Sequence, residues 1–199
     1  LLSYEEIESL LLDRSDSNAP NQARIFFDLI IENKKISLEE ENKQDVLTNF
    51  TVESPIPYNM KNVLKSLEEK DVEMVPGAKT QKQGPLNGKL TRFIQRLKSK
   101  QADKRLNFLF NSDEELLKYD WFGSLINKLL DFGNGNGLKV IDFSEVPSDI
   151  LPLITGLVSR LIFSIQQWMD EKNRHPVALF CDEAHLYIPA HSNGGIEEK

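Results

Sequence analysis

An apolar run that ends in two adjacent acids constrains this chain more than any other feature of its sequence. Val177–Cys181 holds five residues that favour burial, and Asp182 and Glu183 follow at once. A short continuous apolar run is typical of a strand buried on both faces of a parallel sheet. Open sheets of this kind bind ligands at the carboxyl ends of their strands. The sequence therefore predicts that both carboxylates lie at a sheet edge, beside a ligand site.

Helices and strands are expected to alternate in the second half of the chain. The expected strands are 105–110, 138–143 and 177–181, and the expected helices are 122–130 and 149–168. The helices are indicated by apolar residues that recur every three or four positions. Short links between strand, helix and strand favour right-handed parallel crossovers. Residues 101–199 are therefore expected to form part of an α/β core with a parallel sheet.

The first half of the chain reads as helical. Ser3 is expected to cap a first helix, residues 22–35 have one apolar face, and Asn59 is expected to cap a further helix. Residues 76–88 are rich in Gly, Pro, Lys and Gln, which predicts a mobile loop. A basic amphipathic helix follows over residues 89–104. Residues 1–100 are therefore expected to form a helical subdomain.

The two acids have distinct expected roles if a nucleotide binds at the sheet edge. In phosphate-loop ATPases, the first acid of such a pair holds Mg²⁺ through a water molecule, which is the role expected of Asp182. The second acid orients and polarises the attacking water, which is the role expected of Glu183. The alternative is that the pair caps a helix or is simply solvated. His185 is a weaker candidate, because a lone histidine after a strand is more often a packed polar residue.

The chain has no acceptable phosphate-binding loop to accompany the acids. Gly84–Leu90 resembles one, but it is one residue short and places Leu90 where a hydroxyl group would meet the metal. We therefore expect a plain loop there, and only part of a catalytic site in these 199 residues.

The net charge of −7 argues against a surface that is basic throughout. The basic helix at 89–104 either contacts nucleic-acid phosphates or presents an ordinary solvated face, and the sequence slightly favours the solvated face. Arg160 interrupts the apolar pattern of residues 149–168. It is expected either to act at an interface, completing a neighbouring subunit's site, or to extend its charge into solvent.

Cysteine content and hydropathy bear on the compartment. The single Cys181 excludes a disulfide framework and fits a reducing, cytoplasmic setting. No apolar run approaches the roughly 20 residues that span a bilayer, so no membrane partner is expected. Leu1 is not an initiator methionine and no signal-peptide pattern follows it, so we expect a segment cut from a longer protein.

Several segments together resemble the HerA branch of the HerA–FtsK ATPases. The most specific is His175–Pro189, which contains the acid pair, and Val140–Asp149 and Leu161–Phe163 support it. Leu1–Ile7 resembles the start of that family's helical insertion, and Pro55–Tyr58 resembles its end. The likeness spans nearly the whole chain.

The resemblance implies a partial RecA-like core that works in a hexameric ring, hydrolysing ATP with Mg²⁺ to move double-stranded DNA. It implies a nuclease partner in DNA-end processing, or an effector partner in phage defence. Asp182 and Glu183 would inherit the Walker B roles. The family's Walker A loop and its polar γ-phosphate sensor have no counterpart here, so the isolated chain is expected to bind ATP poorly and to be a monomer or weak oligomer.

Two other interpretations remain open. Asp182–His185 spells the DEAH box of another helicase class, although no preceding helicase motifs stand at suitable spacing. The second interpretation is a non-catalytic helical interaction module in which the two acids only cap a helix.

Overall fold

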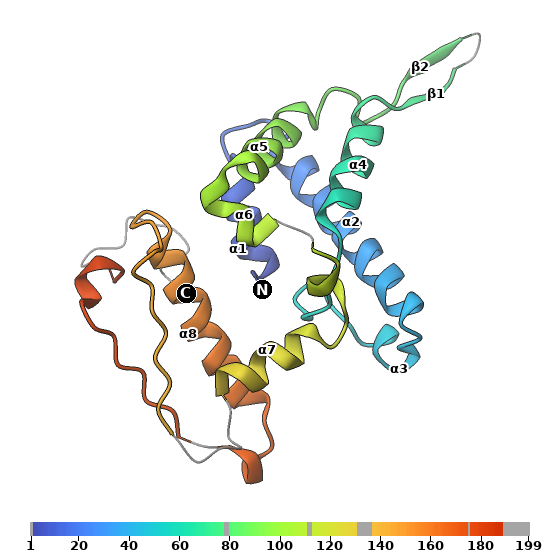
Figure 1. Ribbon diagram of the computed structural model, residues 1–199. Helices are drawn as coiled ribbons and strands as arrows, with labels where there is room; N and C mark the ends of the chain where they lie inside the picture. The colour runs from blue at the N-terminus through green and yellow to red at the C-terminus, as the bar shows by residue number, and fades with distance from the viewer. Residues whose placement is uncertain (1, 78–79, 111–112, 131–136, 175, 189–199) are drawn as a thin grey trace. The chain divides into compact units, whose positions relative to one another are not determined.

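The computed structural model describes residues 2–77, 80–110, 113–130, 137–174 and 176–188 (Figure 1). The chain forms two compact units. Unit 1 is Leu1–Ser124 and unit 2 is Leu125–Lys199. The boundary predicted after residue 100 falls inside a helix of unit 1. Helices dominate, and the described residues contain a single sheet of two antiparallel strands. The predicted partial RecA-like α/β core with a parallel sheet is therefore wrong.

Unit 1 consists mainly of helices joined by short links. Its elements are α1 (Tyr4–Leu11), α2 (Ala19–Glu40), α3 (Gln44–Leu47), α4 (Met60–Asp71), β1 (Met74–Pro76), β2 (Gln81–Gln83), α5 (Thr91–Ala102), η1 (Lys104–Leu106), α6 (Asn107–Phe110) and η2 (Glu114–Leu117). Helix α7 (Trp121–Leu130) crosses the boundary between the units. Unit 2 then has α8 (Leu151–Trp168) and the short 3₁₀ turns η3 (Glu171–Asn173) and η4 (Ala184–Leu186).

Side-chain caps begin two of the helices where the sequence predicted them. The Ser3 hydroxyl accepts a hydrogen bond from the Glu6 N–H at 3.2 Å, and the Glu6 carboxylate accepts one from the Ser3 N–H at 2.7 Å. This reciprocal pair satisfies two backbone donors at the start of α1. The Asn59 side chain accepts the Lys61 N–H at 2.9 Å at the start of α4. Both predicted caps are confirmed.

The core of unit 1 lies between α2, α4 and α5. Phe26 of α2 and Phe93 of α5 are fully buried, and their rings meet edge to face with centroids 5.2 Å apart. Val63 and Leu67, one helical turn apart on α4, are also fully buried. Aromatic and aliphatic side chains of this size contribute about 1.5–3 kcal/mol each when they leave water. The predicted apolar stripes are therefore what holds this unit together.

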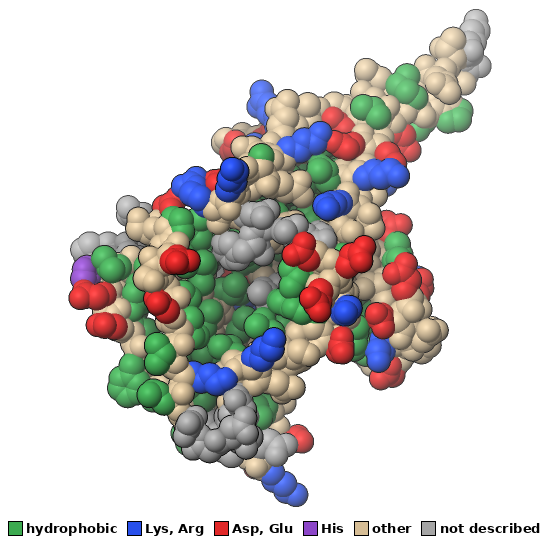
Figure 2. All heavy atoms as spheres, viewed as in Figure 1, with side chains coloured by type: hydrophobic (Ala, Val, Ile, Leu, Met, Phe, Trp, Pro, Cys, Tyr) green, Lys and Arg blue, Asp and Glu red, His purple; other side chains and the backbone are tan. Residues whose placement is uncertain are grey.

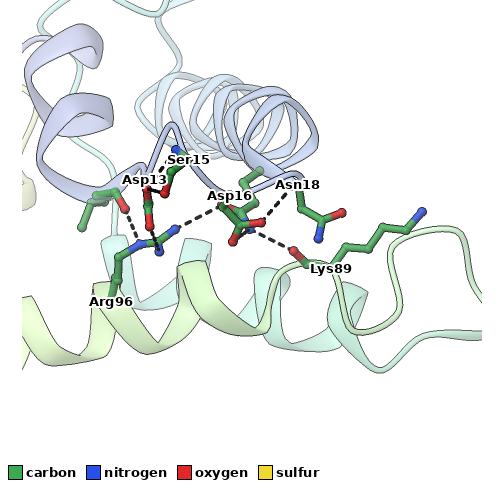
Figure 3. A network of polar contacts seen from close by, with 8 residues as sticks. Asp13, Ser15, Asp16, Asn18, Lys89 and Arg96 are labelled. Carbon is green, nitrogen blue, oxygen red and sulfur yellow. Dashed lines mark hydrogen bonds and ion pairs between the residues drawn. The ribbon is translucent and has the colours of Figure 1, made fainter.

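A polar network fastens α5 to the segment that links α1 and α2 (Figure 3). The buried Gln22 side chain donates to a carboxylate oxygen of Asp16 at 3.2 Å and to the backbone oxygen of Lys89 at 3.0 Å. Arg96 donates to the Leu11 carbonyl at 2.8 Å and to the Gln22 amide oxygen at 3.3 Å. Each amide atom of Gln22 thus has a partner, as buried polar groups require.

A buried lysine fastens the 51–58 segment to α2. The Lys34 ammonium donates to the carbonyls of Val52 at 2.5 Å and Ser54 at 2.7 Å, and it lies 5.6 Å from the centre of the Tyr58 ring. Desolvation lowers the pKa of Lys34 to about 8, against a smaller opposing effect of Glu53.

The predicted mobile loop at 76–88 contains part of a β-hairpin. Strands β1 and β2 pair antiparallel, with Met74 opposite Gln83 and Pro76 opposite Gln81, and they form an arm at one end of unit 1 (Figure 1). A Cβ atom on Gly77 would lie 2.3 Å from the Thr80 backbone oxygen, so the turn accepts only glycine there.

None of the three predicted strands forms. Residues 105–110 belong instead to η1 and α6, where the Asp103 carboxylate accepts the Arg105 N–H at 3.0 Å and supports a helical turn. Segments 138–143 and 177–181 are neither helix nor strand. A strand satisfies its backbone groups only through a neighbouring strand, and the described part of the chain supplies none to either segment. The helices predicted at 122–130 and 149–168 are confirmed, as α7 and α8.

Across the residues that the structure places, no helix is long and apolar enough to cross a bilayer.

Candidate functional site

Asp182 and Glu183 lie together in an exposed turn that follows the 176–181 segment. The Asp182 carboxylate accepts the Glu183 N–H at 3.0 Å. Glu183 has a φ of 50°, in the left-handed region that residues with a side chain seldom occupy. Such a conformation costs on the order of 1–3 kcal/mol. The predicted position at the end of a buried strand is wrong, because the preceding segment is not a strand.

Backbone hydrogen bonds close this turn on itself. The Leu186 N–H donates to the Glu183 carbonyl at 2.9 Å, and the Ile188 N–H donates to the Ala184 carbonyl at 2.8 Å. The Tyr187 hydroxyl donates to the Asp182 backbone oxygen. Desolvation, followed by the nearby negative charges, raises the pKa of Tyr187. The acids are thus presented on a locally defined turn, with both carboxylates exposed to solvent.

His185 lies beside the second acid, which the sequence did not predict. Its Nδ1 is 3.3 Å from a carboxylate oxygen of Glu183, and both side chains are well exposed. The contact is an ion pair only when the imidazole is protonated, and solvent screens it. Glu183 and His185 are only two positions apart, and a 3₁₀ turn brings side chains at this spacing together. Their spacing in the sequence is therefore the signal that could have predicted the contact.

The donor chemistry of the turn fits a magnesium ion only in part. Mg²⁺ in nucleotide sites is held by one or two carboxylates together with water and phosphate oxygens, so Asp182 and Glu183 are suitable ligand types. The described residues contain no group of three or more metal-binding side chains. The turn by itself is therefore too small to hold a metal ion without further ligands.

The loop that resembles a phosphate-binding motif is not suited to binding a nucleotide phosphate. Gly84–Leu90 is a series of turns between β2 and α5, as predicted. Asp71 already caps α5, since its carboxylate accepts the Leu90 N–H at 2.8 Å and the Thr91 hydroxyl at 2.6 Å. An anion placed there would meet a carboxylate instead of free donors.

Arg160 lies in α8 and is half-buried. Its predicted role in completing a neighbouring subunit's site remains a prediction.

Unit 2 exposes a large amount of apolar side chain close in sequence to the acids (Figure 2). Phe180 is 91% exposed and Leu179 is 51% exposed, and in the 138–143 segment Val140 is 85% exposed. The sequence predicted that Leu179 and Phe180 lie in a buried strand and that Val140 lies in a second strand of the same sheet. Isolated apolar residues on a surface are ordinary, whereas contiguous exposed runs mark sites that bind another surface.

No protein-family model matches the sequence, and no curated protein shows significant similarity to it.

Proposed function

We propose that the chain contributes the acid pair Asp182 and Glu183 to the ATP-hydrolysing site of a double-stranded DNA translocase. One observation carries the proposal: the adjacent carboxylates are exposed directly after an apolar segment that is itself uncovered. A solvated helix cap needs no uncovered apolar segment beside it. A site that is completed by another segment of polypeptide needs both features.

The motif assigns the residues' roles within this proposal. Asp182 would hold Mg²⁺ through the ion's water ligands, and Glu183 would orient the water that attacks the nucleotide. Magnesium supplies charge neutralisation at the phosphates when it is bound. The phosphate-binding loop must come from polypeptide outside these 199 residues, on the same or another chain. The exposed Val140, Leu179 and Phe180 offer apolar surface on which such a segment can dock.

The proposal extends to the assembly in which such an acid pair works. A hexameric ring around duplex DNA, with a nuclease or a defence effector as partner, is the arrangement that the resemblance to the HerA branch implies.

A substitution at Glu183 tests the catalytic role. In the full-length product of the gene that encodes these residues, Glu183→Gln should keep ATP binding and lower hydrolysis by about 10²–10⁴-fold. Glu171→Gln is the matched control, since Glu171 is an exposed acid of unit 2 with the same change of charge. Hydrolysis in Glu183→Gln at the rate of the control would show that Glu183 is not the catalytic acid.

A second function is favoured by a different observation. Unit 1 buries its own apolar core and satisfies the buried Gln22, which is what a self-sufficient helical interaction module requires. On this alternative the acids have no catalytic role. Absence of any DNA-stimulated ATP hydrolysis in the full-length product, measured at saturating Mg²⁺ and ATP, would favour the module over the translocase.

A further inference from the structure

Positive charge is concentrated in one stretch of an otherwise acidic chain. Residues 80–105 contain eight Lys and Arg residues and one acid, whereas the whole chain has 24 basic and 31 acidic residues. Figure 2 shows Lys and Arg side chains gathered over the part of unit 1 that contains α5. The stretch therefore has a local charge opposite to that of the molecule as a whole, and its field favours polyanions.

Helix α5 presents this charge on a fixed scaffold. Phe93 and Leu97 are fully buried and Ile94 is 7% exposed, so the apolar face of the helix belongs to the core of unit 1. Arg92, Arg96 and Lys100 follow at four-residue intervals and lie along one side of the helix. Eight residues of helix span about 12 Å, which corresponds to three or four phosphates of one DNA strand.

Internal partners occupy some of these cations and leave others available. Arg96 is held by the Leu11 carbonyl and lies 3.5 Å from an Asp13 carboxylate, and Lys98 lies 2.5 Å from Glu68. By contrast, Lys89, Arg92 and Lys100 have no ion pair or side-chain hydrogen bond within the described part of the chain. Figure 3 shows the Lys89 side chain extending away from the network around Asp16.

We propose that Lys89, Arg92 and Lys100 form a surface, here called the basic surface, that binds the phosphate backbone of duplex DNA. Such contacts read charge and not base sequence, so the binding is sequence-independent. The acids Asp13 and Asp16 lie near Arg92 and Arg96 and limit the net charge on that side.

The burial of α5 distinguishes nucleic acid from a membrane as the partner. A helix that binds a lipid surface inserts its apolar face among the acyl chains. Phe93 and Leu97 cannot do so, because both are fully buried in the unit. The basic surface therefore offers only polar and charged groups, which suits a phosphate backbone. The choice of double-stranded DNA over other nucleic acids rests on the proposed function.

The test measures binding of a fluorescent duplex of about 25 base pairs to the 199-residue chain by anisotropy, at about 50 mM and about 200 mM salt. The variant Lys89→Gln/Arg92→Gln/Lys100→Gln should bind at least about tenfold more weakly, with the slope of log K against log salt smaller by roughly 3. The matched control is Lys35→Gln/Lys61→Gln/Lys65→Gln, which removes the same charge from exposed sites on α2 and α4. Circular dichroism melting checks that both variants fold.

Each other outcome overturns the proposal. Equal affinity in the two triple variants would mean that only net charge matters. If the wild-type protein fails to bind the duplex but binds vesicles of phosphatidylcholine and phosphatidylserine, mixed at about three to one, the basic surface is a membrane-binding surface. Tighter binding of single-stranded DNA than of duplex DNA would show that duplex DNA is not the ligand of the basic surface. The Glu183→Gln variant should bind duplex as the wild type does, so this proposal and the catalytic one fail separately.

Discussion

The two units differ in how far their largest apolar side chains are covered. In unit 1, the large side chains Phe26 and Phe93 have no exposed surface at all. In unit 2, Phe180 is 91% exposed and Val140 is 85% exposed. Both units have strongly apolar segments, so hydrophobic content does not account for the difference. In unit 1, amphipathic helices cover one another. In unit 2, apolar residues of α8 such as Leu157 and Leu161 are buried, but segments 138–143 and 177–181 leave most of their apolar side chains exposed.

The two units also differ in whether their buried polar groups have hydrogen-bond partners. Gln22 in unit 1 is fully buried, and both its amide nitrogen and its amide oxygen have partners. On α8 of unit 2, the Thr155 hydroxyl and the Gln166 amide nitrogen are buried without a hydrogen-bond partner among the residues that the structure describes. An unsatisfied buried polar group costs about 1–3 kcal/mol. Among the described residues, unit 1 thus satisfies the buried Gln22, whereas α8 of unit 2 leaves two buried polar atoms without a partner.

The largest expected effect comes from a pair of matched truncations. Phe26→Ala should lower the free energy of unfolding of unit 1 by about 3–5 kcal/mol, because it leaves a cavity among close-packed side chains. Phe180→Ala deletes the same side-chain atoms at a solvent-exposed position, so it should change the free energy of unfolding by no more than about 0.5 kcal/mol. Urea denaturation followed by circular dichroism measures both. Similar losses in the two variants would abolish the contrast between the units.

The longer helices were predictable from the sequence because each is specified by its own residues, whereas residues 105–110 were predicted as a strand and form η1 and α6. Ser3 and Glu6 form a capping box within four residues, and Val63 and Leu67 define the buried face of α4 by their spacing. The strands were not predictable in the same way. An apolar run such as 177–181 is compatible with a buried strand, but a strand also requires a neighbour to hydrogen-bond with it. That neighbour cannot be inferred from the run itself.

In the candidate site, too, some features could be predicted from the sequence and others depend on the fold. The adjacency of Asp182 and Glu183 follows from the sequence, whereas the contact between His185 and Glu183 depends on the 3₁₀ turn that joins them. The basic surface is intermediate. Its charges are evident in the sequence, but their availability depends on which of them the fold engages, as Arg96 and Lys98 are.

The next largest effect concerns the buried Lys34, whose pKa is lowered from 10.5 to about 8 by desolvation. Between these two values the unfolded chain binds more protons than the folded chain, so stability rises with pH across that window. From pH 7 to 9.5 the wild type should gain roughly 2 kcal/mol relative to Lys34→Met. Urea denaturation at both pH values measures this difference.

Tyr58 limits the upper end of that experiment. Desolvation raises the pKa of its buried hydroxyl, so above about pH 10 the unfolded state gains from tyrosine ionisation. Below pH 9.5 this effect is small and is shared by both proteins. A stability difference that stays constant with pH would mean that the carbonyls of Val52 and Ser54 stabilise the ammonium as strongly as desolvation disfavours it. Unit 1 would then satisfy even its buried charge.

The smallest effect tests the unsatisfied side of the comparison. Thr155→Val keeps the shape of the side chain and removes a buried hydroxyl that has no partner among the described residues. The variant should be as stable as the wild type or more stable by up to about 1 kcal/mol, because no hydrogen bond is lost and a desolvated group is removed. Thermal melting followed by circular dichroism measures the change. A loss of stability would mean that the hydroxyl is satisfied after all, and that α8 is as complete as the helices of unit 1.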